Sequence, residues 1–85
     1  MNYFTDFESI RFILKEGDTM KINVHQLTAA TINSGMSKKK LGQTANVSEA
    51  TITRIFRGEN EVQMVTISKL AKALKIDYQQ IIEND

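Results

Sequence analysis

The sequence predicts one all-α domain of five short helices, which occupies residues 22–85. The first observation behind this prediction is a pattern at Asn23, Ser37, Ser48 and Asp77: an apolar residue, a capping residue, and a second apolar residue four positions after the cap. The second is a one-sided apolar stripe on a segment whose opposite face holds lysines. The third is the length of 85 residues, which leaves room for one domain and one hydrophobic core.

The first predicted helix covers about residues 24–34. Asn23 is its capping residue, and Gln26 stands where a capping box places a Gln or Glu side chain. Gly35 follows the last helical residue, at the place where helices commonly end in a left-handed conformation. The boundaries of this helix are therefore predicted from signals at both ends.

The next two predicted helices are joined by a three-residue turn. Ser37 caps the first and Ser48 caps the second, since each hydroxyl oxygen can accept from a free amide of the opening turn. Asn46 stands where the turn needs a left-handed backbone, which Asn tolerates better than other residues with a side chain. Gly42 allows the two helices to approach closely. This layout is typical of proteins that place a helix in DNA.

The fourth predicted helix holds the apolar stripe. The stripe consists of Ile67, Leu70, Ala71 and Leu74, and the opposite face carries Lys69, Lys72 and Lys75. Two starting points remain open, because Thr66 satisfies the cap pattern and Gln63 can equally begin the first turn. Asp77 repeats the cap pattern, with Gln80 three positions later, and predicts a fifth helix near the end of the sequence.

Residues 1–21 form an N-terminal extension for which the sequence allows two structures. Apolar residues alternate with polar ones on both sides of the turn-like segment 16–18, which is consistent with a β-hairpin. Apolar residues also occur at helical spacing over about residues 5–14, and we favour this short helix. The prediction is thus a helix, with the hairpin as its alternative.

Two roles are open for this extension. An apolar extension on so small a domain would form a dimer contact, or would pack on Ile32, which we expect to be exposed. Alternatively, residues 15–20 can be encoded by a purine-rich ribosome-binding sequence a few nucleotides before an ATG. Met20 would then be the natural initiator, and residues 1–19 would be a non-native leader.

Composition excludes several classes of site. The chain has no cysteine, so disulfides, thiolate catalysis and thiolate metal sites are excluded. His25 is the only histidine and has no carboxylate cluster near it in sequence, so we predict no metal site. We find no combination of nucleophile and base and no phosphate-binding glycine loop, and therefore predict neither an enzyme nor a cofactor. No apolar run approaches the roughly 20 residues of a membrane span and no secretory signal opens the chain, so we expect a cytoplasmic protein.

The net charge of +1 is unevenly distributed. Residues 20–58 contain six basic and one acidic side chain and sum to +5, whereas residues 1–19 and 59–85 each sum to −2. The positive charge is thus concentrated on the segment that contains the predicted helix pair.

This arrangement resembles the helix-turn-helix domain of phage Cro and lambda-type repressors, also called the xenobiotic-response-element family. The resemblance covers about residues 21–82. Its motif elements are Ser37-x-x-x-Leu41, Val47-Ser48, Thr51-Ile52-Thr53-Arg54-Ile55, Arg57-Gly58 and the segment from Thr66 to Leu74. Three residues depart from the family pattern: Gly42 replaces a common Ala, Asn46 a common Gly, and Phe56 a common acidic residue.

The resemblance implies that the helix Glu49–Arg57 enters the major groove of double-stranded DNA. The implied base-reading residues are Ser48, Glu49, Ala50, Thr53 and Arg54, and the implied phosphate-contacting residues are Lys38, Lys39, Thr51 and Arg57. Ala50 and Thr53 suit contacts to thymine methyl groups, and Glu49 can accept from a cytosine amine. Cations in the first turn of a helix oppose its dipole, so Lys38 and Lys39 call for a functional reason.

We therefore predict a sequence-specific, repressor-like transcriptional regulator from a bacterium or phage. One domain presents one recognition helix and too few contacts for tight specific binding, so a homodimer is expected on the DNA operator. The alternative is an antitoxin-type interaction module, which neutralises a toxin and binds DNA only to autoregulate its operon. A toxin or a polymerase is accordingly a possible protein partner.

Overall fold

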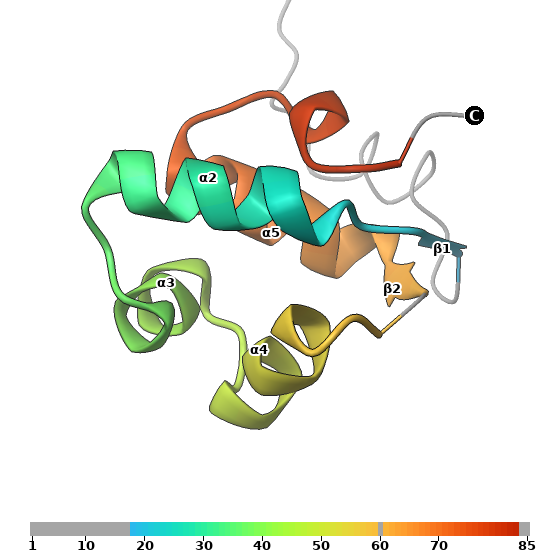
Figure 1. Ribbon diagram of the computed structural model, residues 1–85. Helices are drawn as coiled ribbons and strands as arrows, with labels where there is room; N and C mark the ends of the chain where they lie inside the picture. The colour runs from blue at the N-terminus through green and yellow to red at the C-terminus, as the bar shows by residue number, and fades with distance from the viewer. Residues whose placement is uncertain (1–17, 60, 84–85) are drawn as a thin grey trace, which may run out of the picture.

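The computed structural model describes residues 18–59 and 61–83. Within these residues, four α-helices and a short 3₁₀ helix pack around a common centre, and two short strands lie together at one side (Figure 1). In chain order the elements are β1 (Thr19–Met20), α2 (Val24–Ser34), α3 (Lys38–Ala45), α4 (Glu49–Phe56), β2 (Val62–Gln63), α5 (Met64–Leu74) and η1 (Tyr78–Gln80).

The predicted ends of α2 are confirmed. The Asn23 side-chain oxygen accepts from the backbone N–H of Gln26 at 3.1 Å, which satisfies one of the free amides at the start of the helix. Gly35 has φ 79° and closes the helix in the left-handed conformation. Ile32, near this end, is 70% exposed, as we expected.

The caps of the predicted helix pair are also confirmed. Ser37 accepts from the N–H of Lys40 at 3.1 Å, and Ser48 accepts from the N–H of Thr51 at 3.2 Å. Asn46 adopts the left-handed conformation with φ 60° between the two helices. These signals lie within a few residues of the features they determine, so the local sequence is sufficient to set them.

The prediction of an all-α fold needs one correction, because β1 pairs with β2. The pairing is antiparallel and places Thr19 opposite Gln63 and Met20 opposite Val62. Each strand is two residues long. The alternation after segment 16–18 indicates a strand only as half of a hairpin with the preceding residues, whereas the observed partner of β1 is distant in sequence. Thr19 and Met20 were assigned to the extension by sequence, and in the structure they pair with the segment before α5.

The predicted fifth helix is present as a short 3₁₀ helix and not as an α-helix. Asp77 does act as a cap and accepts from the N–H of Gln79 at 2.9 Å, but only the 3₁₀ helix η1 follows. The chain then extends, and Ile82 forms a β-bridge with Ile22. Ile81 ends η1 with φ −118° and ψ 6°, and the next residue, Ile82, already belongs to the β-bridge, so these two consecutive buried residues do not lie on one face of a helix.

The start of α5 is decided by contacts distant in sequence. The helix begins at Met64, directly after Gln63, so the earlier of the two predicted starting points is the observed one. Gln63 makes no side-chain capping hydrogen bond. The N–H of Met64 instead donates to the backbone oxygen of Asp18 at 2.9 Å, so the segment beside β1 supplies the acceptor that a capping side chain would otherwise provide.

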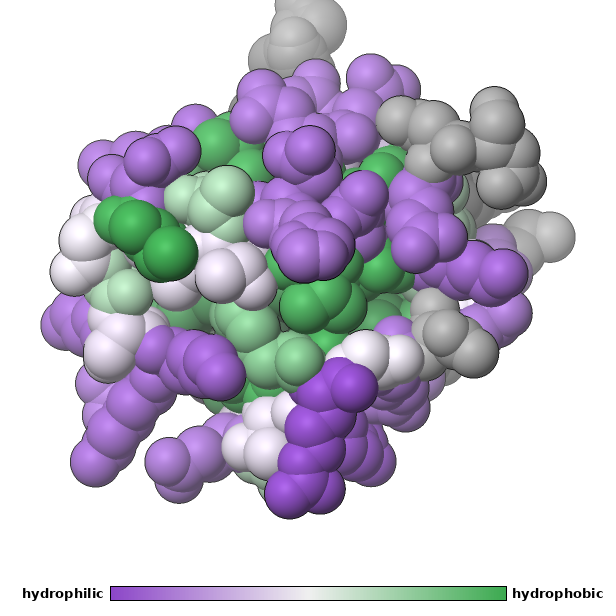
Figure 2. Space-filling model, in the orientation of Figure 1, coloured by the Kyte–Doolittle hydropathy of each residue, from purple (hydrophilic) through white to green (hydrophobic). Residues whose placement is uncertain are grey.

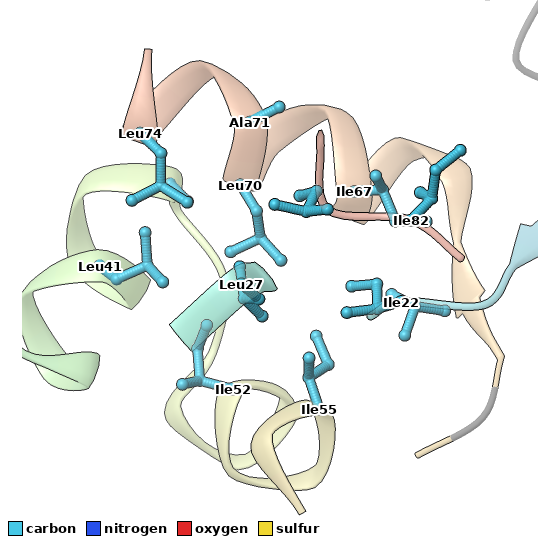
Figure 3. Close-up of a cluster of buried hydrophobic side chains, with 13 residues drawn as sticks. Ile22, Leu27, Leu41, Ile52, Ile55, Ile67, Leu70, Ala71, Leu74 and Ile82 are labelled. Atoms are coloured by element: carbon cyan, nitrogen blue, oxygen red, sulfur yellow. The ribbon is translucent and has the colours of Figure 1, made fainter. Parts of the chain in front are cut away.

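The core lies between α2, α3, α4 and α5. Figure 3 shows Leu41 of α3 and Ile52 and Ile55 of α4 directed toward Leu27 of α2 and Leu70 of α5. The largest fully buried side chains are Leu27, Leu41, Ile55, Ile67, Leu70 and Ile81. Complete burial of one such side chain contributes about 1.5–3 kcal/mol. The helix pair is therefore attached to the domain through its own apolar faces.

The remaining prediction for the N-terminal extension, a helix over residues 5–14 or a hairpin around residues 16–18, lies mostly outside the described residues. At the boundary of the extension, the N–H of Glu83 donates to the oxygen of Lys21 at 2.9 Å, and the N–H of Asn23 donates to the oxygen of Ile81 at 2.8 Å. The start and the end of the described chain thus lie side by side.

Candidate nucleic-acid interface

The crossing of α3 and α4 brings their backbones close together at Gly42. A β-carbon built at this buried position would lie 3.0 Å from the backbone oxygen of Val47 and 3.1 Å from Cγ1 of Ile52. The N–H of Val47 donates to the oxygen of Gly42 at 2.8 Å. The backbones therefore approach so closely that a hydrogen atom is the side chain that fits without adjustment. This contact determines how α4 leaves α3.

The outer face of α4 is polar and exposed. Ile52 and Ile55, three positions apart on one face of the helix, are buried at 2% and 0% exposure. The exposed side chains are Glu49, Ala50, Thr53, Arg54 and Arg57. The predicted base-reading residue Ser48 is exposed before this helix and is also its cap. Hydrophilic side chains project from the edge of the molecule formed by α3 and α4, at the bottom of Figure 2.

An open groove of about 430 Å³ runs along the outer side of the helix pair. It is lined by Lys38, Lys39, Gly42, Gln43, Asn46, Val47, Ser48 and Glu49. Four of these eight residues are among those predicted to contact DNA. The start of α3 and the start of α4 therefore contribute side chains to the same concave surface, with two cations against one carboxylate.

Gln43 and Asn46 line this groove, although the sequence analysis assigned them no role in DNA binding. Gln43 follows Lys39 by four positions on α3, so both residues lie on one face of the helix. That spacing was the signal in the sequence that could have identified Gln43. Asn46 was interpreted only as a turn residue, and its exposed amide adds donors and acceptors to the groove.

Arg54 and Thr51 line a second depression, on another side of α4. The other residues of this depression are Thr19, Ile55, Glu59, Glu61, Val62, Gln63 and Thr66. The Arg54 Nε atom lies 3.5 Å from Oε1 of Glu59, in an ion pair whose side chains are 62% and 41% exposed. The predicted site residues thus line two depressions on two sides of α4. Ala50 and Thr53 are exposed on the same helix and line neither of these depressions.

The hydroxyl groups of Ser48 and Thr51 bond to each other. Ser48 Oγ donates to Thr51 Oγ1 at 2.9 Å while it accepts from the Thr51 backbone N–H. Both side chains are therefore oriented before any ligand arrives. Each oxygen keeps a lone pair that can accept from a ligand.

Within residues 18–59 and 61–83, no group of three or more His, Cys, Asp or Glu side chains is arranged to hold a metal ion. Over the same part of the chain, no helix has the length and apolar character that crossing a membrane requires.

Residues 30–81 match a family model described as helix-turn-helix. The chain belongs to this helix-turn-helix family. The match covers more than half of the sequence and confirms the resemblance to Cro and lambda-type repressors. In the helix-turn-helix, α3 is the first helix and α4 the second.

Two solved structures have a similar fold. The restriction-modification controller protein C.AhdI from Aeromonas hydrophila is 26% identical, with a TM-score of 0.62 over 67% of this chain and 86% of its own. The transcriptional regulator VanUg is 25% identical, with a TM-score of 0.64 over 80% of this chain and 89% of its own. No curated protein sequence matches the chain.

Proposed function

We propose that this protein is a DNA-binding transcriptional regulator that inserts α4 into the major groove. The observation behind the proposal is the open groove of the helix pair, where Lys38, Lys39, Ser48 and Glu49 gather on a surface that the core does not use. The similarity to a controller protein and to a transcriptional regulator supports it. A rigidly packed helix pair with an exposed polar face is what groove insertion requires.

The charged residues would divide between the two strands of the duplex. A helix in the major groove, which is about 12 Å wide, faces phosphates of both strands. Lys38 and Lys39 lie on one side of α4, whereas Arg54 lies on another side. We assign the lysines to phosphates of one strand and Arg54, with Thr51 and Arg57, to the opposite wall of the groove or to a guanine at its edge.

Base reading would fall to the exposed first turns of α4. Glu49 suits a cytosine amine, while Ala50 and Thr53 suit thymine methyl groups. Ser48 and Thr51 have their hydroxyls oriented by each other, which lowers the conformational freedom lost when they bind.

We further propose that the protein acts in the cytoplasm as a repressor-like homodimer. Specific protein–DNA complexes usually bind at 10⁻⁸ M or tighter, which a single helix of this length does not reach alone. A two-fold dimer would place its recognition helices about 34 Å apart, one turn of DNA. Footprinting at saturation is expected to protect two half-sites with this separation, and protection of one half-site alone would contradict the dimer.

Selection of bound sequences from a random duplex pool tests the function itself. Recovery of one two-fold symmetric motif would support the regulator. Absence of any enrichment would contradict it. Lys72→Ala is the matched control, because Lys72 is exposed on α5 and lines a different depression, so its loss is expected to leave the selected motif unchanged.

A further inference from the structure

The ring of Phe56, the last residue of α4, lies under the side chain of Lys38 at the start of α3. The Lys38 Nζ atom is 4.8 Å from the centroid of the ring, within the roughly 6 Å range of a cation–π contact. Lys38 is exposed, whereas Phe56 is half-buried and packs against the core. The domain therefore holds the ring, while the ammonium group stays accessible to a ligand.

This contact follows from the crossing of the two helices. At the crossing, Gly42 of α3 meets Ile52 of α4. Lys38 stands four residues before Gly42, and Phe56 stands four residues after Ile52, so each lies one turn from the crossing on the same face of its helix. The close approach that sets the direction of α4 thus also brings the ring to the lysine.

An aromatic ring beside Lys38 is favourable because of the charges at the start of α3. The first turn of α3 contains three lysines and no acidic residue, and cations there oppose the helix dipole and repel one another. The negative face of an aromatic ring offsets this cost. In addition, a free lysine side chain loses considerable rotamer freedom when it binds, and a lysine already restrained by a ring loses less.

We propose that Phe56 is a positioning residue for DNA binding, whose ring holds the Lys38 ammonium group where it contacts a DNA phosphate. The inference rests on the proposed function, because it assigns that phosphate contact to Lys38. Phe56 stands where the family commonly has an acidic residue, so the ring contact is a feature of this chain. Lys39 provides the matched comparison, since it lines the same groove and the ring contact belongs to Lys38.

A double-mutant cycle tests the proposal, with affinity for a short random-sequence duplex measured at several salt concentrations. Phe56→Leu keeps an apolar side chain but removes the ring, and we expect about two- to fivefold weaker binding. In a Lys38→Ala background the same substitution is expected to cause no further loss. In a Lys39→Ala background, Phe56→Leu should weaken binding as much as it does in the wild type. Phe56→Tyr keeps the ring and should bind like the wild type.

Proton NMR of the free protein reports on the contact without DNA. The ring current should shift the Lys38 methylene protons upfield in the wild type and in Phe56→Tyr, and this shift should vanish in Phe56→Leu. A wild-type protein that does not bind the duplex at low salt would refute the proposed function and this inference with it. Binding by the wild type, with equal losses from Phe56→Leu in the Lys38→Ala and Lys39→Ala backgrounds, would refute the role of Phe56 alone.

Circular dichroism melting establishes that each variant is folded. Should Phe56→Leu fail to fold, Phe56→Trp replaces it, because Trp has the strongest cation–π face of the aromatic residues. A folded Phe56→Trp protein should bind at least as tightly as the wild type. Weaker binding by this variant, or tighter binding by a folded Phe56→Leu protein, would show that the ring does not hold Lys38 in the phosphate-contacting position.

Discussion

The inner and outer faces of α4 differ in what surrounds them. Ile52 and Ile55 are almost completely buried and connect the helix to the core. Glu49, Ala50 and Thr53, on the same two turns, are exposed. The buried positions of this helix therefore stabilise the fold, and the exposed positions are the ones proposed to recognise DNA. It follows that substitutions on the inner face should change the free energy of unfolding, whereas those on the outer face should change DNA binding alone.

Ile55→Ala is expected to have the largest effect. Ile55 is 0% exposed, so truncation removes buried methyl groups and leaves a cavity, at a cost of about 2–5 kcal/mol in the free energy of unfolding. Urea unfolding followed by circular dichroism measures this cost. Thr53→Ala is the control from the outer face, and we expect a change within about 0.5 kcal/mol. Equal losses in the two variants would contradict the division of the helix into two faces.

Gly42→Val tests the close approach of the two helices. The added side chain meets the backbone oxygen of Val47 and the side chain of Ile52, and such overpacking costs about 1–3 kcal/mol. Gly42→Ala is expected to be nearly neutral, because roughly 1 kcal/mol of gained helix propensity offsets a small displacement of the neighbours. The same urea experiment measures both. A Val variant as stable as the wild type would mean that the helices can separate without loss.

The signals that predicted this pair correctly are local. Ser37, Ser48 and Asn46 each act on backbone groups within a few residues, so the sequence around them is enough. The β1–β2 pairing joins Thr19 to Gln63, which are more than 40 residues apart, and the alternation around Met20 does not identify that partner. No local sequence rule indicates such a contact, which is why the all-α prediction missed it.

In the candidate site, too, some features follow from local sequence and others do not. Helical spacing places Ile52 and Ile55 on one face of α4, and in the structure that face is buried. The direction of a long side chain depends on contacts with residues outside its own helix. Arg54 pairs with Glu59 of the following loop, and Lys38 lies over the ring of Phe56. The assignment of individual residues to bases and phosphates stays a prediction.

Glu49→Gln examines base reading on the outer face. Gln replaces an acceptor-only carboxylate with an amide that prefers adenine, so the preferred base pair should change by about 1–3 kcal/mol. Selection from a random duplex pool, repeated with the variant, measures this preference. The melting temperature should barely move, because Glu49 is exposed. An unchanged selected motif would remove Glu49 from the base-reading set.

Lys39→Ala examines phosphate contact on the same groove. Loss of one phosphate contact should lower the slope of log affinity against log salt by about 0.9, while the selected motif stays the same. Lys72→Ala on α5 should leave the slope unchanged. A shift in base preference caused by Lys39→Ala, together with no shift from Glu49→Gln, would reverse the assignment of reading and positioning residues.

Glu59→Gln should have the smallest effect and addresses the other side of α4. The Arg54–Glu59 ion pair is exposed on both sides, so it contributes about 0.2–1 kcal/mol at most to folding and weakens with salt. In the complex, the same carboxylate competes with DNA phosphate for the guanidinium group. Removal of its charge should therefore tighten duplex binding by about two- to fivefold at low salt.

Glu61→Gln is the control that separates the effect of losing the Arg54 ion pair from the effect of losing one negative charge. Glu61 lines the same depression as Arg54, but its carboxylate accepts from the Thr19 hydroxyl. Both variants remove one negative charge near the proposed interface, so any repulsion of DNA is reduced alike. A larger gain for Glu59→Gln, which disappears in an Arg54→Ala background, would show that Arg54 is released to bind phosphate. Weaker binding would instead mean that Glu59 orients Arg54 for DNA, because loss of an orienting partner lowers affinity whereas loss of a competitor raises it.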